Sequence, residues 1–128
     1  MLDTKLKVLA IDYGTKRIGL ALSFGSLADP LTIISNDQNS IAYICKIVDD
    51  YQVGKIIIGL SENETAEKTR TFTELLKRSL SIPIELYDET LSTKAVRNKL
   101  EEAHKSQQRR VDHLAAAEFL QEWLDTNN

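Results

Sequence analysis

The 128-residue sequence contains one cysteine, Cys45, so an internal disulfide framework is excluded. Its apolar runs are short, and none approaches the ~20 residues that a membrane-spanning helix needs. The first residues, MLDTKLK, are not followed by the apolar segment of a secretion signal. We therefore expect a cytoplasmic protein with no membrane partner.

The sequence also lacks a large excess of charge of either sign, because its net charge is only −3. The total charge therefore gives no indication of nucleic-acid binding. The 42% hydrophobic and 27% charged content is typical of a globular protein, and the length predicts one domain, residues 1–128. Basic residues nevertheless gather between positions 94 and 110. Such a stretch could face phosphates, but from composition alone a solvated helix face plus loop is the preferred explanation.

The residues that are present are organised around positions 8–23, VLAIDYGTKRIGLALS. An apolar strand ends on Asp12, a turn through Gly14 reverses the chain, and a second strand returns. Gly14 is expected to adopt a positive φ, and Gly19 to mark a bulge or a close approach to the backbone. A carboxylate at the end of an apolar strand is costly unless it is paired, hydrogen-bonded or metal-bound.

The remainder of the chain alternates between strand and helix patterns, which predicts an α/β protein with a mixed five-stranded sheet and helices on its faces. The order is β-β-β-α-β-α-β-α-α. After a loop at 24–30, strands are expected at 31–34, 55–60 and 84–88. A helix at about 39–51 is expected to be capped by Asn36 or Asp37 and ended by Gly54, and a helix at about 64–80 is expected to bury Phe72, Leu75, Leu76 and Leu80. Two further helices are expected, one that ends at about 103 and one over about 110–125.

Three acids are expected at one edge of this sheet. Glu89 follows the fifth strand as Asp12 ends the first, and the carboxyl ends of parallel strands share an edge. Asp112 is expected in the first turn of the last helix, on the apolar face that also carries Ala115, Ala116, Phe119 and Trp123. Singly, each acid could stabilise a turn or a helix N-terminus. Together they repel one another unless a cation intervenes, and their oxygens suit Mg²⁺ or Mn²⁺. Two such ions can clamp the oxygens of a phosphodiester displacement.

Four segments in order resemble the YqgF/RuvX family of pre-16S rRNA nucleases and Holliday-junction-resolvase-like proteins. They are VLAIDYGTKRIGLALS, KIIIGLS, LYDETLST and VDHLAAAEFLQEWLD, and the resemblance spans about residues 5–125. It implies a ribonuclease-H-like fold and hydrolysis of RNA or branched-DNA phosphodiesters in the bacterial cytoplasm, chiefly at the 5′ end of 16S rRNA.

The resemblance also implies roles for particular residues. Asp12, Glu89 and Asp112 match the metal-ligating acids. Lys16 and Arg17 match possible phosphate contacts, and Gly14 and Gly19 match the glycines that set the turn geometry. Two positions depart from the family pattern: Thr90 stands in place of an arginine and Ser61 in place of a proline.

Three hypotheses follow for the function. The first is a metal-dependent nuclease, monomeric or homodimeric, that acts on pre-rRNA or branched DNA, with the assembling small ribosomal subunit as a candidate partner. Its nucleic acid would be steered by Arg17, Lys94, Arg97, Arg109 and Arg110. The second is a non-catalytic nucleic-acid-binding module for ribosome assembly with the same fold. The third, a nucleotide-binding protein of the actin and sugar-kinase type, needs a second domain that 128 residues do not hold.

Overall fold

A computed structural model describes residues 6–60, 66–88 and 114–127. The elements in this part of the chain are β1 (Lys7–Tyr13), β2 (Arg17–Phe24), β3 (Leu27–Ser35), α1 (Ser40–Tyr51), β4 (Val53–Leu60), α2 (Ala66–Ser79), β5 (Ile84–Asp88) and α4 (Leu114–Asn127). The helix expected to end near residue 103 and the start expected for the last helix lie outside the described residues.

The five strands form one mixed sheet in the order β3-β2-β1-β4-β5. β1, β4 and β5 are parallel, whereas β2 is antiparallel to both β1 and β3. Strands β1 and β4, which carry the continuous apolar runs Val8–Ile11 and Ile56–Ile58, therefore lie side by side in the interior of the sheet, as strands buried on both faces should. This confirms the predicted fold class. The parallel strands end together, and we call that end of the sheet the carboxyl edge.

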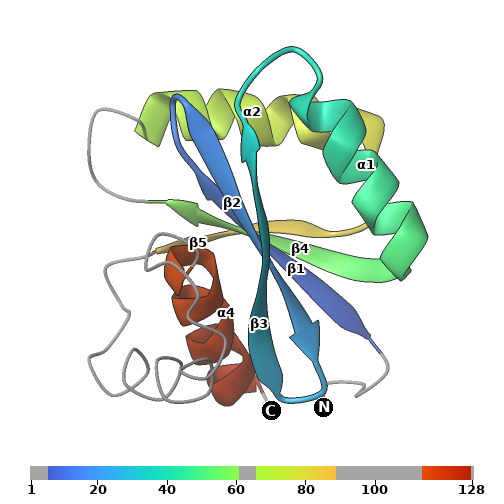
Figure 1. The fold of residues 1–128 in the computed structure, drawn as a ribbon, viewed down its shortest axis with the longest axis vertical. Helices are drawn as coiled ribbons and strands as arrows, with labels where there is room; N and C mark the ends of the chain where they lie inside the picture. Colours follow the sequence, from blue (N-terminus) through green and yellow to red (C-terminus); the bar gives the residue numbers. More distant parts are fainter. Residues whose placement is uncertain (1–5, 61–65, 89–113, 128) are drawn as a thin grey trace.

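Helices cover both faces of the sheet (Figure 1). On one face, α1 and α2 bury a cluster that includes Leu9 and Ile11, which we call the α1–α2 core. On the other face, α4 buries a cluster that includes Val8 and Ala10, the α4 core. The two pairs come from alternate positions of β1, because successive side chains of a strand point to opposite faces. The same alternation decides on which face Asp12 lies.

Helix α4 runs antiparallel to β4 and β5. The ring of Phe119 stacks on Tyr87, near the end of β5, with ring centroids 5.9 Å apart. Four residues later, the ring of Trp123 lies 5.1 Å from Nζ of Lys55, near the start of β4. The N-terminal end of α4 is therefore directed toward the carboxyl edge.

Four local expectations were wrong or incomplete. Residues 27–30 belong to β3 rather than to a loop; Pro30 is accommodated because β3 is an edge strand and its ladder shifts register beside Ala21.

The helices also differ from expectation. α1 ends with Gln52 in the left-handed region, at φ 55°, whereas Gly54 lies in β4. A Cβ on Gly54 would overlap Leu6. In α2, Leu75 is exposed, and Thr69 and Thr73 are buried in addition to Phe72 and Leu76.

Cys45 lies on α1, as the helical pattern predicted, and it is partly buried. Burial raises the pKa of its thiol above the usual value, which keeps the thiol protonated at neutral pH. Within the described residues, no helix is long and apolar enough to cross a membrane.

The side chain of Gln121 fastens α4 to the hairpin between β2 and β3. Gln121 is fully buried; its Oε1 accepts a hydrogen bond from the Ala28 N–H at 2.9 Å, and its Nε2 donates to the Ser26 carbonyl at 2.8 Å. Replacing Gln121 by leucine keeps the volume but leaves the buried Ala28 N–H without this acceptor. We expect a loss of about 1–3 kcal/mol in the free energy of unfolding, measured with urea.

The matched control for Gln121 is Thr126→Ala, on the same helix. The Thr126 hydroxyl donates to the Glu122 carbonyl, but the residue is exposed, so water can replace the bond. Its free energy of unfolding should change by less than about 0.5 kcal/mol. Equal losses in the two variants would contradict the role assigned to Gln121.

Candidate active site

Asp12 lies near the end of β1, at the carboxyl edge, and is partly buried. It has the parity of Val8 and Ala10, which belong to the α4 core, and therefore lies on the α4 face of the sheet. Its neighbours across the sheet are Gly19 on β2 and Gly59 on β4. Neither neighbour has a side chain that could cover the Asp12 carboxylate.

A cavity of about 140 Å³ lies at this position. Its lining comprises Asp12, Gly14, Arg17, Gly19 and Ile33. The volume corresponds to roughly five water molecules. An acidic and a basic residue, Asp12 and Arg17, therefore line one small cavity. From its sequence, Arg17 was expected only to contact phosphate; in the structure it also lines the cavity of Asp12.

The β1–β2 turn that joins these residues is held by Asn36. The Asn36 side-chain Nδ2 donates to the Gly14 carbonyl at 2.7 Å, and the Asn36 backbone N–H donates to the Lys16 carbonyl at 2.9 Å. Asn36 was expected to cap α1 instead, as was Asp37. The helix begins at Ser40, and Asp37 accepts a hydrogen bond from the Asn39 N–H at 2.8 Å. Asn36 is thus a positioning residue for the turn.

Gly14 is required for a different reason from the one expected. Among the described glycines, Gly25 has a positive φ, 61°, whereas Gly14 does not. A Cβ on Gly14 would instead lie 2.5 Å from the carbonyl oxygen of Arg17. The turn therefore depends on a close approach of backbone to backbone. At Gly19, the expected irregularity of the strand falls one residue further on, between Leu20 and Ala21.

Replacing Gly14 by alanine should force the backbone at Arg17 to shift. We expect a loss of about 1–3 kcal/mol in the free energy of unfolding, together with weaker cleavage of nucleic acid, because Asp12 and Arg17 flank the turn. The control is Gly25→Ala in the β2–β3 turn, where a Cβ meets no atom within 4 Å but φ is positive. Gly25→Ala should lose stability and leave cleavage of the remaining folded protein unchanged.

The structure tests only part of the predicted site. It brings together Asp12, Gly14, Arg17 and Gly19, with Lys16 exposed in the adjoining turn. The predicted residues outside the described ranges are Glu89, Lys94, Arg97, Arg109, Arg110 and Asp112. In the described part of the chain, no three His, Cys, Asp or Glu side chains form a possible metal site. The predicted cluster of three acids thus stays a prediction.

The described residues nevertheless fit a hydrated divalent cation. Asp12 supplies a hard oxygen ligand, and the cavity has room for the water molecules that Mg²⁺ retains. Asp88, the residue before Glu89 in the sequence, pairs with Leu60 at the same carboxyl edge. The N-terminal end of α4, two residues after Asp112, is directed there as well.

Solved structures of Holliday junction resolvases share this fold. RuvC of Thermus thermophilus, in complex with its Holliday junction substrate, superposes with a TM-score of 0.67 at 12% identity, over 95% of each chain. The fowlpox virus resolvase bound to Holliday junction DNA superposes with a TM-score of 0.55 at 13% identity, over 95% of this chain and 99% of that chain. The fold is therefore ribonuclease-H-like, as expected.

Sequence similarity defines the family. The model of the RuvX family, described as Holliday junction resolvase, matches residues 6–126, and the chain belongs to this family. A protein of Thermoanaerobacter pseudethanolicus is 38% identical over 94% of this chain and 97% of its own length. A protein of Halothermothrix orenii is 34% identical over 96% of this chain and 97% of its own length. Both carry the name "Putative pre-16S rRNA nuclease". The resemblance found in the sequence is confirmed.

Proposed function

We propose that the chain is a single-domain, metal-dependent nuclease that hydrolyses phosphodiester bonds at the carboxyl edge of the sheet. The observation that carries the proposal is the placement of Asp12 between two glycines, on a cavity that Arg17 also lines. A carboxylate there can bind a cation, and the guanidinium can bind a phosphate oxygen. The family and the names of its members support the same reaction class.

Asp12, Glu89 and Asp112 would hold Mg²⁺ or Mn²⁺. When bound, the ion would supply positive charge for a phosphodiester whose negative charge increases in the transition state. The chain's own residues have simpler tasks. Asp12 binds and orients the ion, and the glycines beside it leave room for the phosphate. Lys16 and Arg17 hold the nucleic-acid backbone. Lys94, Arg97, Arg109 and Arg110 would extend this basic surface.

The proposed substrate is the precursor of 16S rRNA, cut near its 5′ end in the cytoplasm, at or near the assembling small ribosomal subunit. Branched DNA is the second candidate substrate, because the family is described as Holliday junction resolvase and the two fold neighbours were solved bound to junction DNA. We further propose that the active unit is a monomer or a homodimer.

A non-catalytic binding module is the alternative function. Thr90 stands where the family has an arginine, and the net charge of −3 is low for an enzyme of nucleic acids. The two functions are separated by incubating the wild-type protein with labelled 16S precursor RNA, or with a four-way DNA junction, in Mg²⁺, Mn²⁺ or EDTA. Metal-dependent cleavage supports the nuclease. Binding without cleavage in either metal supports the module.

Lys16 and Arg17 should determine much of the salt dependence of binding. Each phosphate contact contributes about 0.7–0.9 to the slope of log K against log salt concentration, so replacing both residues by alanine should reduce the slope by about 1.4–1.8. The measurement is a titration of labelled nucleic acid in EDTA at several salt concentrations.

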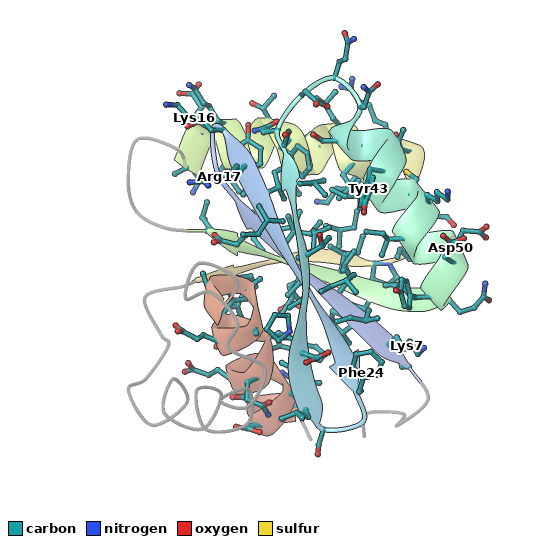
Figure 2. All side chains as sticks on the ribbon, in the orientation of Figure 1. Lys7, Lys16, Arg17, Phe24, Tyr43 and Asp50 are labelled. Atoms are coloured by element: carbon teal, nitrogen blue, oxygen red, sulfur yellow. The ribbon has the colours of Figure 1, made fainter. Side chains whose placement is uncertain are left out.

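The control for this pair is Lys7→Ala. Figure 2 shows Lys7 at the opposite end of the same strands, beside Phe24. Its Nζ lies 5.9 Å from the centroid of the Phe24 ring and 5.8 Å from that of Tyr51. An equal decrease of the slope in Lys7→Ala would mean that Lys16 and Arg17 contribute only as net charge.

A further inference from the structure

A second and larger cavity, of about 580 Å³, lies on the other side of the β1–β2 turn. It opens on the α1–α2 face of the sheet, between the segment before α1 and helix α2. Its volume is within the range of about 300–1,000 Å³ that is typical of small-molecule sites. The function proposed above makes no use of this cavity.

The apolar part of the lining is aromatic. Tyr13 and Phe72 contact each other with ring centroids 4.9 Å apart and planes tilted by 42°. Ile41 and Leu75 extend this surface, and Leu75 is 46% exposed although it lies on an amphipathic helix. A flat heterocyclic ligand could stack against these aromatic rings and contact the exposed leucine.

The polar part of the lining is rich in hydrogen-bond acceptors. Asp37 and Glu67 bring two carboxylates, against one ammonium from Lys68, and Gln38 and Thr71 add an amide and a hydroxyl. This charge balance disfavours a phosphate inside the cavity. It suits the exocyclic amino group of adenine, cytosine or guanine, which a carboxylate or amide oxygen can accept.

The cavity lies across β1 from the candidate active site. Tyr13, in its wall, follows Asp12 in the sequence, and the two side chains lie on opposite faces of β1. Asn36 lines the cavity and also holds the Gly14 carbonyl in the turn. A strand that crosses the turn with its phosphates on Lys16 and Arg17 therefore has the Asp12 cavity on one side and the aromatic cavity on the other.

We propose that this cavity binds one unpaired, amino-bearing nucleobase of the nucleic-acid substrate. The inference deepens the proposed nuclease function, on which it depends for the choice of ligand. It assigns recognition to a place where the nucleic acid is single-stranded, because a base can enter the cavity only when it is not paired.

The test compares two tryptophan variants of α2, using the full chain in EDTA so that no cleavage occurs. Thr71 and Ser79 are both exposed, and each donates its hydroxyl to the carbonyl four residues earlier. Only Thr71 lines the cavity, so Thr71→Trp should fill it, whereas Ser79→Trp should not. The probes are oligoadenylate and oligouridylate RNA of about ten nucleotides and a fully paired RNA duplex, titrated by fluorescence anisotropy.

Wild-type protein should bind oligoadenylate more tightly than oligouridylate. Thr71→Trp should weaken oligoadenylate binding by about tenfold, the loss expected for one stacked base, while Ser79→Trp leaves it unchanged. Duplex binding should be equal in all three proteins. Equal oligoadenylate affinities of the two variants, or a parallel loss of duplex binding in Thr71→Trp, would overturn the proposal.

The result is separable from that of the proposed function. Cleavage of precursor RNA by the wild-type protein in Mn²⁺ tests the nuclease and does not involve the tryptophan variants. A protein that cleaves but shows no effect of Thr71→Trp retains its nuclease function and loses the base site. A protein that does not cleave but loses oligoadenylate affinity in Thr71→Trp retains the base site and is a binding module.

Discussion

Replacing Asp12 by asparagine is expected to lower cleavage by at least about a hundredfold. Changes to groups that only support a metal ligand already cost about 10–100-fold in metal affinity or activity, and the loss of a ligand itself should exceed that. Asparagine has nearly the size of aspartate and keeps one carbonyl oxygen, so the strand should remain intact. The measurement is the initial rate of cleavage of precursor RNA in Mn²⁺, with unfolding by urea as the test of the fold.

The control for this variant is Asp50→Asn. Asp50 is an exposed acid on α1, and Figure 2 shows it far from Arg17, on the opposite side of the molecule. Both variants raise the net charge by one unit, so a general effect of charge on RNA binding would appear in both. Cleavage by Asp12→Asn at the wild-type rate would remove Asp12 from the site. Equal losses in the two variants would indicate an effect of charge rather than of a ligand.

The central strands of the fold were predictable because local patterns of apolar residues determine them. Val8–Ile11 and Ile56–Ile58 are continuous apolar runs bounded by turns, and both became strands buried on two faces. The position of Asp12 at a strand end followed from the same runs.

The features that the sequence analysis missed depend on distant partners. Gln121 looks like one more polar residue of an amphipathic helix, and its hydrogen bond to Ala28 spans 93 positions. The role of Asn36 depends on a turn 22 positions earlier. Pro30 indicates a loop to any local rule, and only its place on an edge strand permits it in β3.

The candidate site shows the same division. Asp12, Gly14 and Gly19 were predicted from one stretch of sequence. Gly59 was not, because its position beside Asp12 is set by the register between β1 and β4, which a single sequence does not display. A weak signal was available: a glycine inside the apolar run KIIIGL marks a place where another group approaches the backbone.

Replacing Phe119 by alanine should produce the largest loss of stability among the variants considered. Phe119 is 1% exposed, stacks on Tyr87 and belongs to the α4 core, which joins α4 to the sheet on the face of Asp12. Removal of a buried phenyl ring costs about 3–5 kcal/mol. This is a large fraction of the about 5–15 kcal/mol that usually separates folded from unfolded domains.

The matched control for Phe119 is Phe24→Ala, the same substitution at a residue that is 48% exposed and contacts the ammonium of Lys7. It should lose at most about 1 kcal/mol. Unfolding in urea is followed by circular dichroism and by the fluorescence of Trp123, the only tryptophan, which is buried in the α4 core. Because both cores share one sheet, the two signals should change together in the wild type and in Phe119→Ala. If the Trp123 signal changes first in Phe119→Ala, α4 detaches independently, and a loss of cleavage at those urea concentrations then reports the contribution of α4 to the site.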